Sequence, residues 1–403
     1  MTVVDGIQSF TEGNPNVTGI YNNKIIKFTK LNNPNSRIVR GIEFPLAINL
    51  TLTDLNGNDI IINNDENENN QLIYNDISKF VNDLSSKYDY FKKLIRKHAT
   101  LVIKGFNSNN PIFFSSFVDN FAIGSNLIQY EQNGIAHPRI NIAKNVTTVN
   151  KSTGFKRLYA HQEFSRFKKY PSILSFFAKI PSISGGNETL THATELFDSL
   201  NENYPEFIEN ILNKGIYLTQ TWPYEEKLSD NSIYSWKATH SFGKLINFGD
   251  DLETEKLKAG KICKEFVVDD FEWTNDNGLK LHEHTQPIRI HPYTNNPILF
   301  SSLPTYYQKY KYDLENSKNP NLIKPPITYD DGEEIPIKYL EFILDKSIEL
   351  CYEHKFELGD IVFVDNYQAY HGRTAYGNEN REILASFWDD IKENKKDPPI
   401  LKL

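Results

Sequence analysis

Three residues of this chain could bind one metal ion together: His161, Glu163 and His371. In an extended strand, side chains two positions apart point to the same face, so the imidazole of His161 and the carboxylate of Glu163 can lie side by side while Gln162 faces away. An imidazole and a carboxylate suit iron(II) in an open facial site when a third ligand comes from elsewhere in the chain. His371 is the candidate for that third position.

The His-x-Glu pair says little alone, because about one such pattern is expected by chance in a chain with 10 His and 52 Asp plus Glu. A second block, residues 359–389, adds weight to it. Its sequence predicts a turn, a strand at 361–364 whose far end carries His371, and a returning strand at 381–388. We expect these two strands to pair as neighbours.

These residues resemble the pattern of a known family, the iron(II)- and 2-oxoglutarate-dependent oxygenases of the taurine dioxygenase and clavaminate synthase-like group. That pattern is H-x-D/E, a G-G-x-T or G-G-E-T turn, a distal D-N…H-G-R, and an arginine roughly ten to fifteen residues later. The matching segments here are His161 with Glu163, the turn at 185–189, Asp365-Asn366, His371-Gly372-Arg373, and Arg381. The segments LVIKGF at 101–106 and GIAHPR at 134–139 resemble the family's early core strand and the arginine segment after it.

The resemblance implies a mainly β fold with flanking helices around a double-stranded β-helix, the jelly-roll or cupin-like core. It also implies Fe(II) bound by His161, Glu163 and His371, and 2-oxoglutarate held as co-substrate by Arg381 and Thr189. One extra residue lies inside the glycine turn of this chain and can shift Thr189 by one position.

The implied reaction is the O2-dependent oxidation of an unactivated C–H bond in a small organic-acid or amino-acid-derived metabolite, with release of succinate and CO2. Hydroxylation is the default outcome, and desaturation or oxidative ring closure uses the same oxidant. Arg373, Arg166, Lys156 and Arg157 lie near the ligands in sequence and could pair with an acidic substrate. Two alternatives stay open: a jelly-roll metalloenzyme that does not use 2-oxoglutarate, and a non-catalytic binding protein on the same fold.

The composition fits one large domain spanning residues 1–403, and its 22 Tyr and 26 Phe favour sheet-rich packing. A net charge of -8 argues against a nucleic-acid partner, because phosphate binding depends on Lys and Arg. No apolar run predicts a membrane span or a signal peptide, and the two cysteines predict no disulfide scaffold. We therefore expect a cytoplasmic protein that acts on a small molecule.

Apolar residues recur at helical spacing from 76 to 94, with Asp76 as a candidate cap, and similar patterns predict helices at 112–121, 192–212 and 337–353. Residues 219–281 are long, polar and aromatic, which is typical of a lid or insert at a substrate entrance.

The cluster His282-Glu283-His284, with His291 downstream, is a rival metal site. We rank it below His161 and Glu163, because no glycine-threonine turn or paired arginine lies near it in the sequence.

Overall fold

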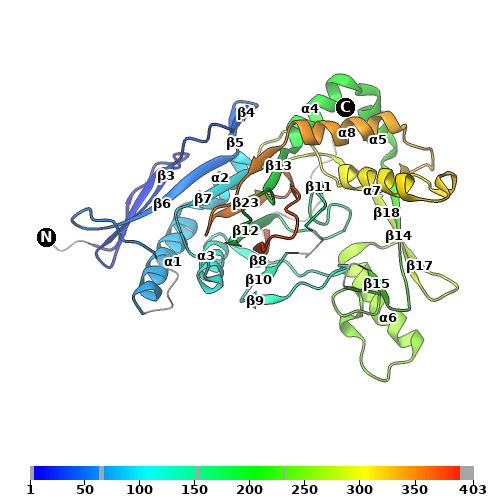
Figure 1. Ribbon diagram of the computed structural model, residues 1–403, viewed down its shortest axis with the longest axis horizontal. Coiled ribbons are helices and arrows are strands. Elements are labelled where there is room, and N and C mark those ends of the chain that lie inside the picture. The colour runs from blue at the N-terminus through cyan, green and yellow to red at the C-terminus, as the bar shows by residue number, and fades with distance from the viewer. Residues whose placement is uncertain (1–3, 63–67, 150–153, 230–231, 391–403) are drawn as a thin grey trace.

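The computed structural model describes residues 4–62, 68–149, 154–229 and 232–390. A large sheet of eleven strands runs through the middle of the molecule (Figure 1). Its main path is, in spatial order, β1 (Gly6–Ser9), β2 (Val17–Tyr21), β3 (Lys24–Lys30), β6 (Leu46–Asp54), β7 (Thr100–Lys104), β23 (Ile361–Asp365), β12 (Ile173–Ile180), β25 (Glu382–Asp390), β10 (Val146–Thr148) and β9 (Asn141–Ala143), with β8 (Leu127–Gln129) paired to β25.

A second sheet of four strands faces part of the first. Its order is β11 (Leu158–His161), β24 (Ala369–Arg373), β13 (Glu188–His192) and β22 (Tyr352–His354). One apolar cluster contains Phe176 and Val362 from the large sheet together with Leu190 and Ala369 from the small sheet, so the two sheets pack face to face. Successive strands from β11 to β13, and again from β22 to β25, alternate between the sheets. This alternation is the double-stranded β-helix, so the expected fold class is confirmed.

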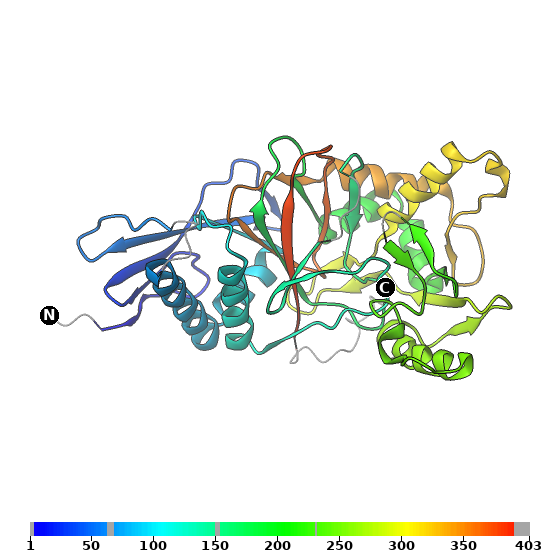
Figure 2. The same ribbon diagram turned by 60° about the horizontal axis from the view of Figure 1, so that its bottom comes forward.

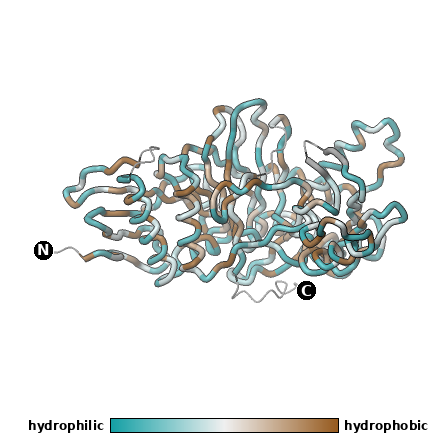
Figure 3. Tube along the Cα trace, turned by 90° about the horizontal axis from the view of Figure 1, so that it is seen from below, coloured by the Kyte–Doolittle hydropathy of each residue, from teal (hydrophilic) through white to brown (hydrophobic). Residues whose placement is uncertain are grey.

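Helices cover the outer faces of both sheets (Figures 1 and 2). The helices are α1 (Glu68–Tyr88), α2 (Tyr90–His98), α3 (Pro111–Gly124), α4 (Ala193–Asn203), α5 (Pro205–Lys214), α6 (Leu252–Ile262), α7 (Leu303–Asn316) and α8 (Ile337–Glu349). Helices α1 and α3 pack side by side against the large sheet, and α4, α5, α7 and α8 share an apolar cluster on the far side of the small sheet. Coloured by hydropathy, the trace is largely brown in the strands of the middle and teal in the loops of the periphery (Figure 3).

The segment 219–281 forms most of a separate lobe at the end of the molecule opposite β1 to β3 (Figure 1). It contains α6, the π-helical turn Cys263–Val267, and parts of a four-stranded sheet of β17 (Phe271–Trp273), β18 (Leu279–Thr285), β14 (Ile216–Trp222) and β21 (Ile327–Tyr329). Trp222, Trp236 and Cys263 are buried in its own apolar cluster. Shorter elements of the chain are the strand pairs β4 (Arg37–Val39) with β5 (Ile42–Phe44), β15 (Lys227–Ser229) with β16 (Ser232–Tyr234), and β19 (Ile288–Ile290) with β20 (Pro297–Leu299), and the 3-10 turns Gly243–Leu245 and Pro320–Leu322.

Two expectations about the strands near the site are wrong. Strands β23 and β25 are not neighbours, because β12 lies between them and Ile173 pairs with Asp365 on one side and Trp388 on the other. His371 is not the far end of β23 but belongs to β24 in the opposite sheet. A hairpin was expected, whereas in a jelly-roll the turn after β23 carries the chain across to the facing sheet.

The helix expected from residue 76 begins earlier, at Glu68, and breaks at Asp89, whose φ of 53° is left-handed. Asp76 is therefore not a cap; it is a buried mid-helix residue whose carboxylate lies 2.8 Å from Nζ of Lys24. The expected helices near 112–121 and 337–353 are confirmed as α3 and α8. The helix expected at 192–212 is divided at Pro205 into α4 and α5. Within the described part of the chain, no helix has the length and apolar character needed to cross a bilayer.

Candidate active site

The two sheets bring His161, Glu163 and His371 together between them. His161 ends β11 and is the register partner of His371 in β24, with ring centroids 4.2 Å apart. Oε2 of Glu163 lies 3.6 Å from Nε2 of both imidazoles. One candidate ligand atom from each residue lies within 4.8 Å of the other two, and no other group of His, Cys, Asp or Glu side chains among the described residues converges in this way.

The hydrogen bond of His161 and the pKa shifts of both imidazoles fit a bound cation. Nδ1 of His161 donates to the carbonyl oxygen of Tyr159 at 2.9 Å, which directs Nε2 toward Glu163. Burial, helped by the nearby His161, lowers the pKa of His371 to about 4, so this ring is neutral as a ligand must be. Burial would lower the pKa of His161, but the Glu163 carboxylate raises it, and a cation would take the place of that proton.

The two oxygens of the Glu163 carboxylate have different partners. Its Oε1 accepts a hydrogen bond from Arg139 Nη2 at 2.5 Å, while Oε2 faces the two histidines. Burial would raise the pKa of Glu163, but Arg139 and the imidazoles outweigh it and hold that pKa well below its usual range. The group is therefore ionised and keeps one oxygen for an ion. Two histidines and one carboxylate with open positions are the donor set of non-haem iron(II) oxygenases.

These residues line a cavity of about 80 Å³, which we call the metal pocket. It is also lined by Arg139, Glu188, Arg373, Arg381, Phe176 and Ile383. Arg381 immediately precedes β25 and has the same parity as Ile383 and Phe387, which face the small sheet, so its side chain points inward. Its Nε donates to the carbonyl oxygen of Gly186 at 3.0 Å, and burial lowers its pKa to about 10.

Thr189 lies on the other face of its strand. In β13, Leu190 packs into the cluster between the sheets, and strand alternation places Glu188 on that same inner face. Thr189 pairs with Gly372 on the outer face and does not line the metal pocket. The place expected for the threonine is taken by Glu188, because the glycine turn is one residue longer than the family pattern. Burial raises the pKa of Glu188 to about 7 despite the neighbouring Arg381.

Of the four candidate substrate residues, Arg373 alone lines the metal pocket. Arg166 makes two 3.1 Å hydrogen bonds to the buried Glu283. Lys156 lies over the ring of Tyr312 at 4.0 Å, and Arg157 lies 3.9 Å from Glu353. All four lie near the ligands in sequence, but the strand and turns around the ligands direct the side chains of Arg166, Lys156 and Arg157 away from the metal pocket.

The rival cluster on β18 does not converge on one point. Strand alternation buries Glu283 on one face, while His282 and His284 share the other. His282 contacts the hydroxyl of Tyr217, and His284 pairs with Asp330. Each imidazole thus has its own partner, and the ranking of this cluster below His161 and Glu163 fits the geometry.

Sequence reasoning missed Glu188 and Arg139 as pocket residues. Arg139 belongs to the segment GIAHPR, for which the sequence indicates no partner. Its guanidinium forms an ion pair with Glu163 and lies 4.4 Å from the ring centre of Phe387. The signal for Glu188 was parity, because the residue two positions before a buried strand leucine faces the same way.

Comparison with known proteins agrees with this geometry. The family described as Taurine catabolism dioxygenase TauD, TfdA family matches residues 71–388. The chain belongs to the TauD/TfdA family. It is a dioxygenase that uses Fe(II) and 2-oxoglutarate, and the residues of the metal pocket fit both.

Among curated relatives of this TauD/TfdA dioxygenase is a clavaminate synthase-like protein of Arabidopsis thaliana. It is 23% identical over 308 residues, which cover 76% of this chain and 86% of the relative. The dapdiamide synthesis protein DdaC of Enterobacter agglomerans is 20% identical over 313 residues, covering 76% and 87%. Among solved structures, PvcB, an Fe, alpha-ketoglutarate dependent oxygenase from an isonitrile synthetic pathway, aligns over 95% of both chains with 11% identity and a TM-score of 0.44.

Proposed function

We propose that this dioxygenase oxidises an unactivated C–H bond of a small anionic metabolite, an organic acid or an amino-acid derivative, with Fe(II) held by His161, Glu163 and His371. The observation that carries the proposal is the convergence of these three ligand atoms inside a pocket lined by arginines. When bound, Fe(II) supplies open coordination positions for 2-oxoglutarate and O2, and decarboxylation of 2-oxoglutarate to succinate and CO2 accompanies oxidation of the substrate.

The charges of the metal pocket support an anionic substrate. Among the described residues that line it, three guanidinium groups face two carboxylates, and a bound Fe(II) adds two positive charges. A dianionic co-substrate offsets only part of that charge, so a carboxylate on the substrate is favoured. We assign Arg381 to the distal carboxylate of 2-oxoglutarate, because a guanidinium binds a carboxylate through two parallel hydrogen bonds. Arg373, whose side chain also lines the pocket, is assigned to a carboxylate of the substrate, while Arg139 stays paired with Glu163.

Titration of the anaerobic protein with Fe(II) and then 2-oxoglutarate tests the cofactor part of the proposal. We expect the charge-transfer absorption of an iron-bound 2-oxo acid to appear only after both additions. A screen of organic acids and amino acids for stimulated succinate release then tests the substrate class. Stimulation by neutral or cationic compounds alone would contradict it.

We also propose that residues 1–403 act as one oxygenase domain, with 219–281 as a lid beside the entrance. The lobe is tied to the segment leading to Arg139 by a hydrogen bond from the amide of Gly134 to the carbonyl of Ser241, at 2.8 Å. Substrate in the pocket would therefore restrain the lobe through that segment. Limited proteolysis should cut within 219–281, and more slowly when Fe(II), 2-oxoglutarate and substrate are present. Equal cleavage in both conditions would mark the lobe as an inert insertion.

A further inference from the structure

Glu163 lies where β11 has already ended. The strand stops at His161, and Phe164 has a left-handed φ of 56°, so the chain turns sharply at the carboxylate. Among the described strands none pairs with Glu163, and the pleat that orients His161 does not extend to it. Its side chain is also drawn toward Arg139 by the 2.5 Å hydrogen bond to Oε1. Something other than the sheet must therefore fix the backbone that aims Oε2 at the histidines.

The side chain of Asn366 does this. Its Oδ1 accepts a hydrogen bond from the amide of Glu163 at 2.8 Å, and its Nδ2 donates to the carbonyl of Glu163 at 2.9 Å. Nδ2 also donates to the carbonyl of Pro171 at 2.9 Å. The carboxamide thus makes both hydrogen bonds that a paired strand would make to Glu163. It is completely buried, and both of its donor positions are used.

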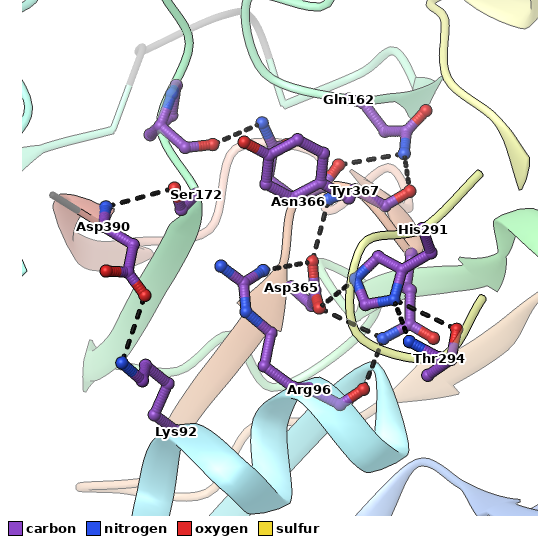
Figure 4. Close-up of polar contacts among 12 residues, drawn as sticks. Lys92, Arg96, Gln162, Ser172, His291, Thr294, Asp365, Asn366, Tyr367 and Asp390 are labelled. Carbon is purple, nitrogen blue, oxygen red and sulfur yellow. Dashed lines mark hydrogen bonds and ion pairs between the residues drawn. The ribbon is translucent and has the colours of Figure 1, made fainter. Parts of the chain in front are cut away.

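The turn that contains Asn366 is itself held by the side chain of Gln162. Nε2 of Gln162 donates to the carbonyls of Asn366 at 2.9 Å and Tyr367 at 2.7 Å. Two side-chain amides therefore link the same two segments reciprocally, as Figure 4 shows for Gln162, Asn366 and Tyr367. The backbone amide of Asn366 donates to the carbonyl of Ser172, which fixes it to the start of β12.

Asp365, the preceding residue, anchors the turn to the core. Its carboxylate lies 2.9 Å from Nη1 of Arg96 in α2 and 3.1 Å from Nε2 of His291, and it accepts a hydrogen bond from the amide of Tyr367 (Figure 4). Burial would raise the pKa of Asp365, but Arg96 and His291 outweigh it and hold the pKa far below its usual range. This ion-paired turn is a rigid platform for the carboxamide next to it.

We propose that Asn366 is the positioning residue for the metal-binding carboxylate of Glu163. The inference rests on the proposed function, in which Glu163 ligates the ion. Asn366 does not touch the metal; it holds the peptide of Glu163 so that Oε2 points at the histidines while Oε1 stays on Arg139. Without it, the ligand keeps its chemistry but loses its direction.

The test compares two amide-to-acid substitutions. Asn366→Asp keeps the shape and the acceptor but removes both donors and places a carboxylate against two carbonyl oxygens. The control is Gln286→Glu, because Gln286 also donates from Nε2 to two backbone carbonyls, of Ile211 and Leu212, and accepts from a backbone amide, that of Ile288. Gln286 does not line the metal pocket.

The readouts are Mn(II) affinity, by calorimetry of the full chain, and the unfolding midpoint. We expect Asn366→Asp to bind Mn(II) about 10–100-fold more weakly than wild type, the range for residues that orient metal ligands, and Gln286→Glu to bind it as wild type does. Both variants should lose stability. If Asn366→Asp or the milder Asn366→Ser keeps wild-type affinity in its folded state, the proposal is overturned. Asn366→Ser also provides the test if the aspartate variant does not fold.

A fourth variant separates this inference from the assignment on which it rests. Glu163→Ala should lose Mn(II) binding if Glu163 is a ligand. Wild-type affinity in Glu163→Ala would refute the ligand assignment itself. Loss of affinity in Glu163→Ala with none in the Asn366 variants would leave the ligands in place and remove only the positioning role.

Discussion

Two cavities of this dioxygenase have arginines in their walls, yet they differ in how the charges are arranged. The metal pocket is the smaller, at about 80 Å³. The other, which we call the insert cavity, has about 280 Å³ and is lined by residues 165–168, 267–270, 282, 284–286 and 289. Beside it, Arg166 and the fully buried Glu283 form a closed pair. In the metal pocket, Arg373, Arg381 and Glu188 face the cavity itself.

The difference shows that size is a poor guide to the reactive site. A closed ion pair satisfies both partners and leaves no demand for a ligand, whereas charged groups that face a cavity are costly until a ligand compensates them. The smaller pocket has more guanidinium groups than carboxylates in its lining, and it has the donor set for a metal.

The largest effect is expected from the proposed metal ligands. His371→Ala should abolish iron-dependent succinate formation and Mn(II) binding, because two remaining donors cannot hold the ion in the facial site. His282→Ala, beside the insert cavity, should keep both properties. Loss of activity in His282→Ala with full activity in His371→Ala would place the reactive site at the insert cavity instead of the metal pocket.

Removing the acid of the closed pair should unfold the protein more easily. Glu283→Ala leaves the partly buried guanidinium of Arg166 without its charge partner, which costs about 3 kcal/mol of unfolding free energy, the lower end of the range for buried pairs. Urea unfolding of the metal-free protein measures this. Glu272→Ala is the matched control, because it breaks the exposed pair with Lys280 on the same strand as Glu283 and should change the unfolding free energy little.

Removing the charge of Glu188, the acid that faces the metal pocket, should raise the unfolding free energy, whereas Glu283→Ala should lower it. The pKa of Glu188 is raised from 4.5 to about 7, so the folded protein favours the protonated form and loses stability as pH rises from 4.5 through 7. Glu188→Gln avoids that loss. We expect it to stabilise the metal-free protein by up to about 3 kcal/mol at pH 8 and by little at pH 4.5. A Glu188→Gln effect that is equal at both pH values would show that the acid is not held in its neutral form.

The smallest effect is expected at the co-substrate end. Arg381→Lys should weaken 2-oxoglutarate binding by about 1–3 kcal/mol, because an ammonium cannot make the paired hydrogen bonds of a guanidinium. Iron affinity should stay close to wild type. Anaerobic titration of the iron-loaded variant measures the dissociation constant, with Arg157→Lys, outside the pocket, as the control. An unchanged constant in Arg381→Lys would remove this arginine from the proposed site.

The family resemblance was sufficient for the fold class and for the three candidate ligands, because the motifs that carry it are short local runs of residues, and it also pointed to the inward position of Arg381. Sequence patterns failed where the chain crosses between sheets. The neighbours of β23 cannot be read from strand patterns, since β12, which separates it from β25, comes from far away in the chain. Long side chains that are near a ligand in sequence, such as Arg157, can point away from it in space, because neighbouring residues of a strand or turn face different directions. Thr189 and Glu188 differ by one position, and only the pleat decides which of them faces the pocket.

The amide contacts of Asn366 have an evolutionary consequence. A ligand embedded in a ladder moves whenever the strands beside it shift, so changes in the pocket walls would disturb the metal. Here the side chain of Asn366 attaches the backbone of Glu163 to a buried turn and not to β13 or β25, which form part of those walls. Substitutions in β13 or β25 can therefore reshape the space for a new substrate while the carboxylate stays where it is. The chemistry and the specificity of this fold can change separately.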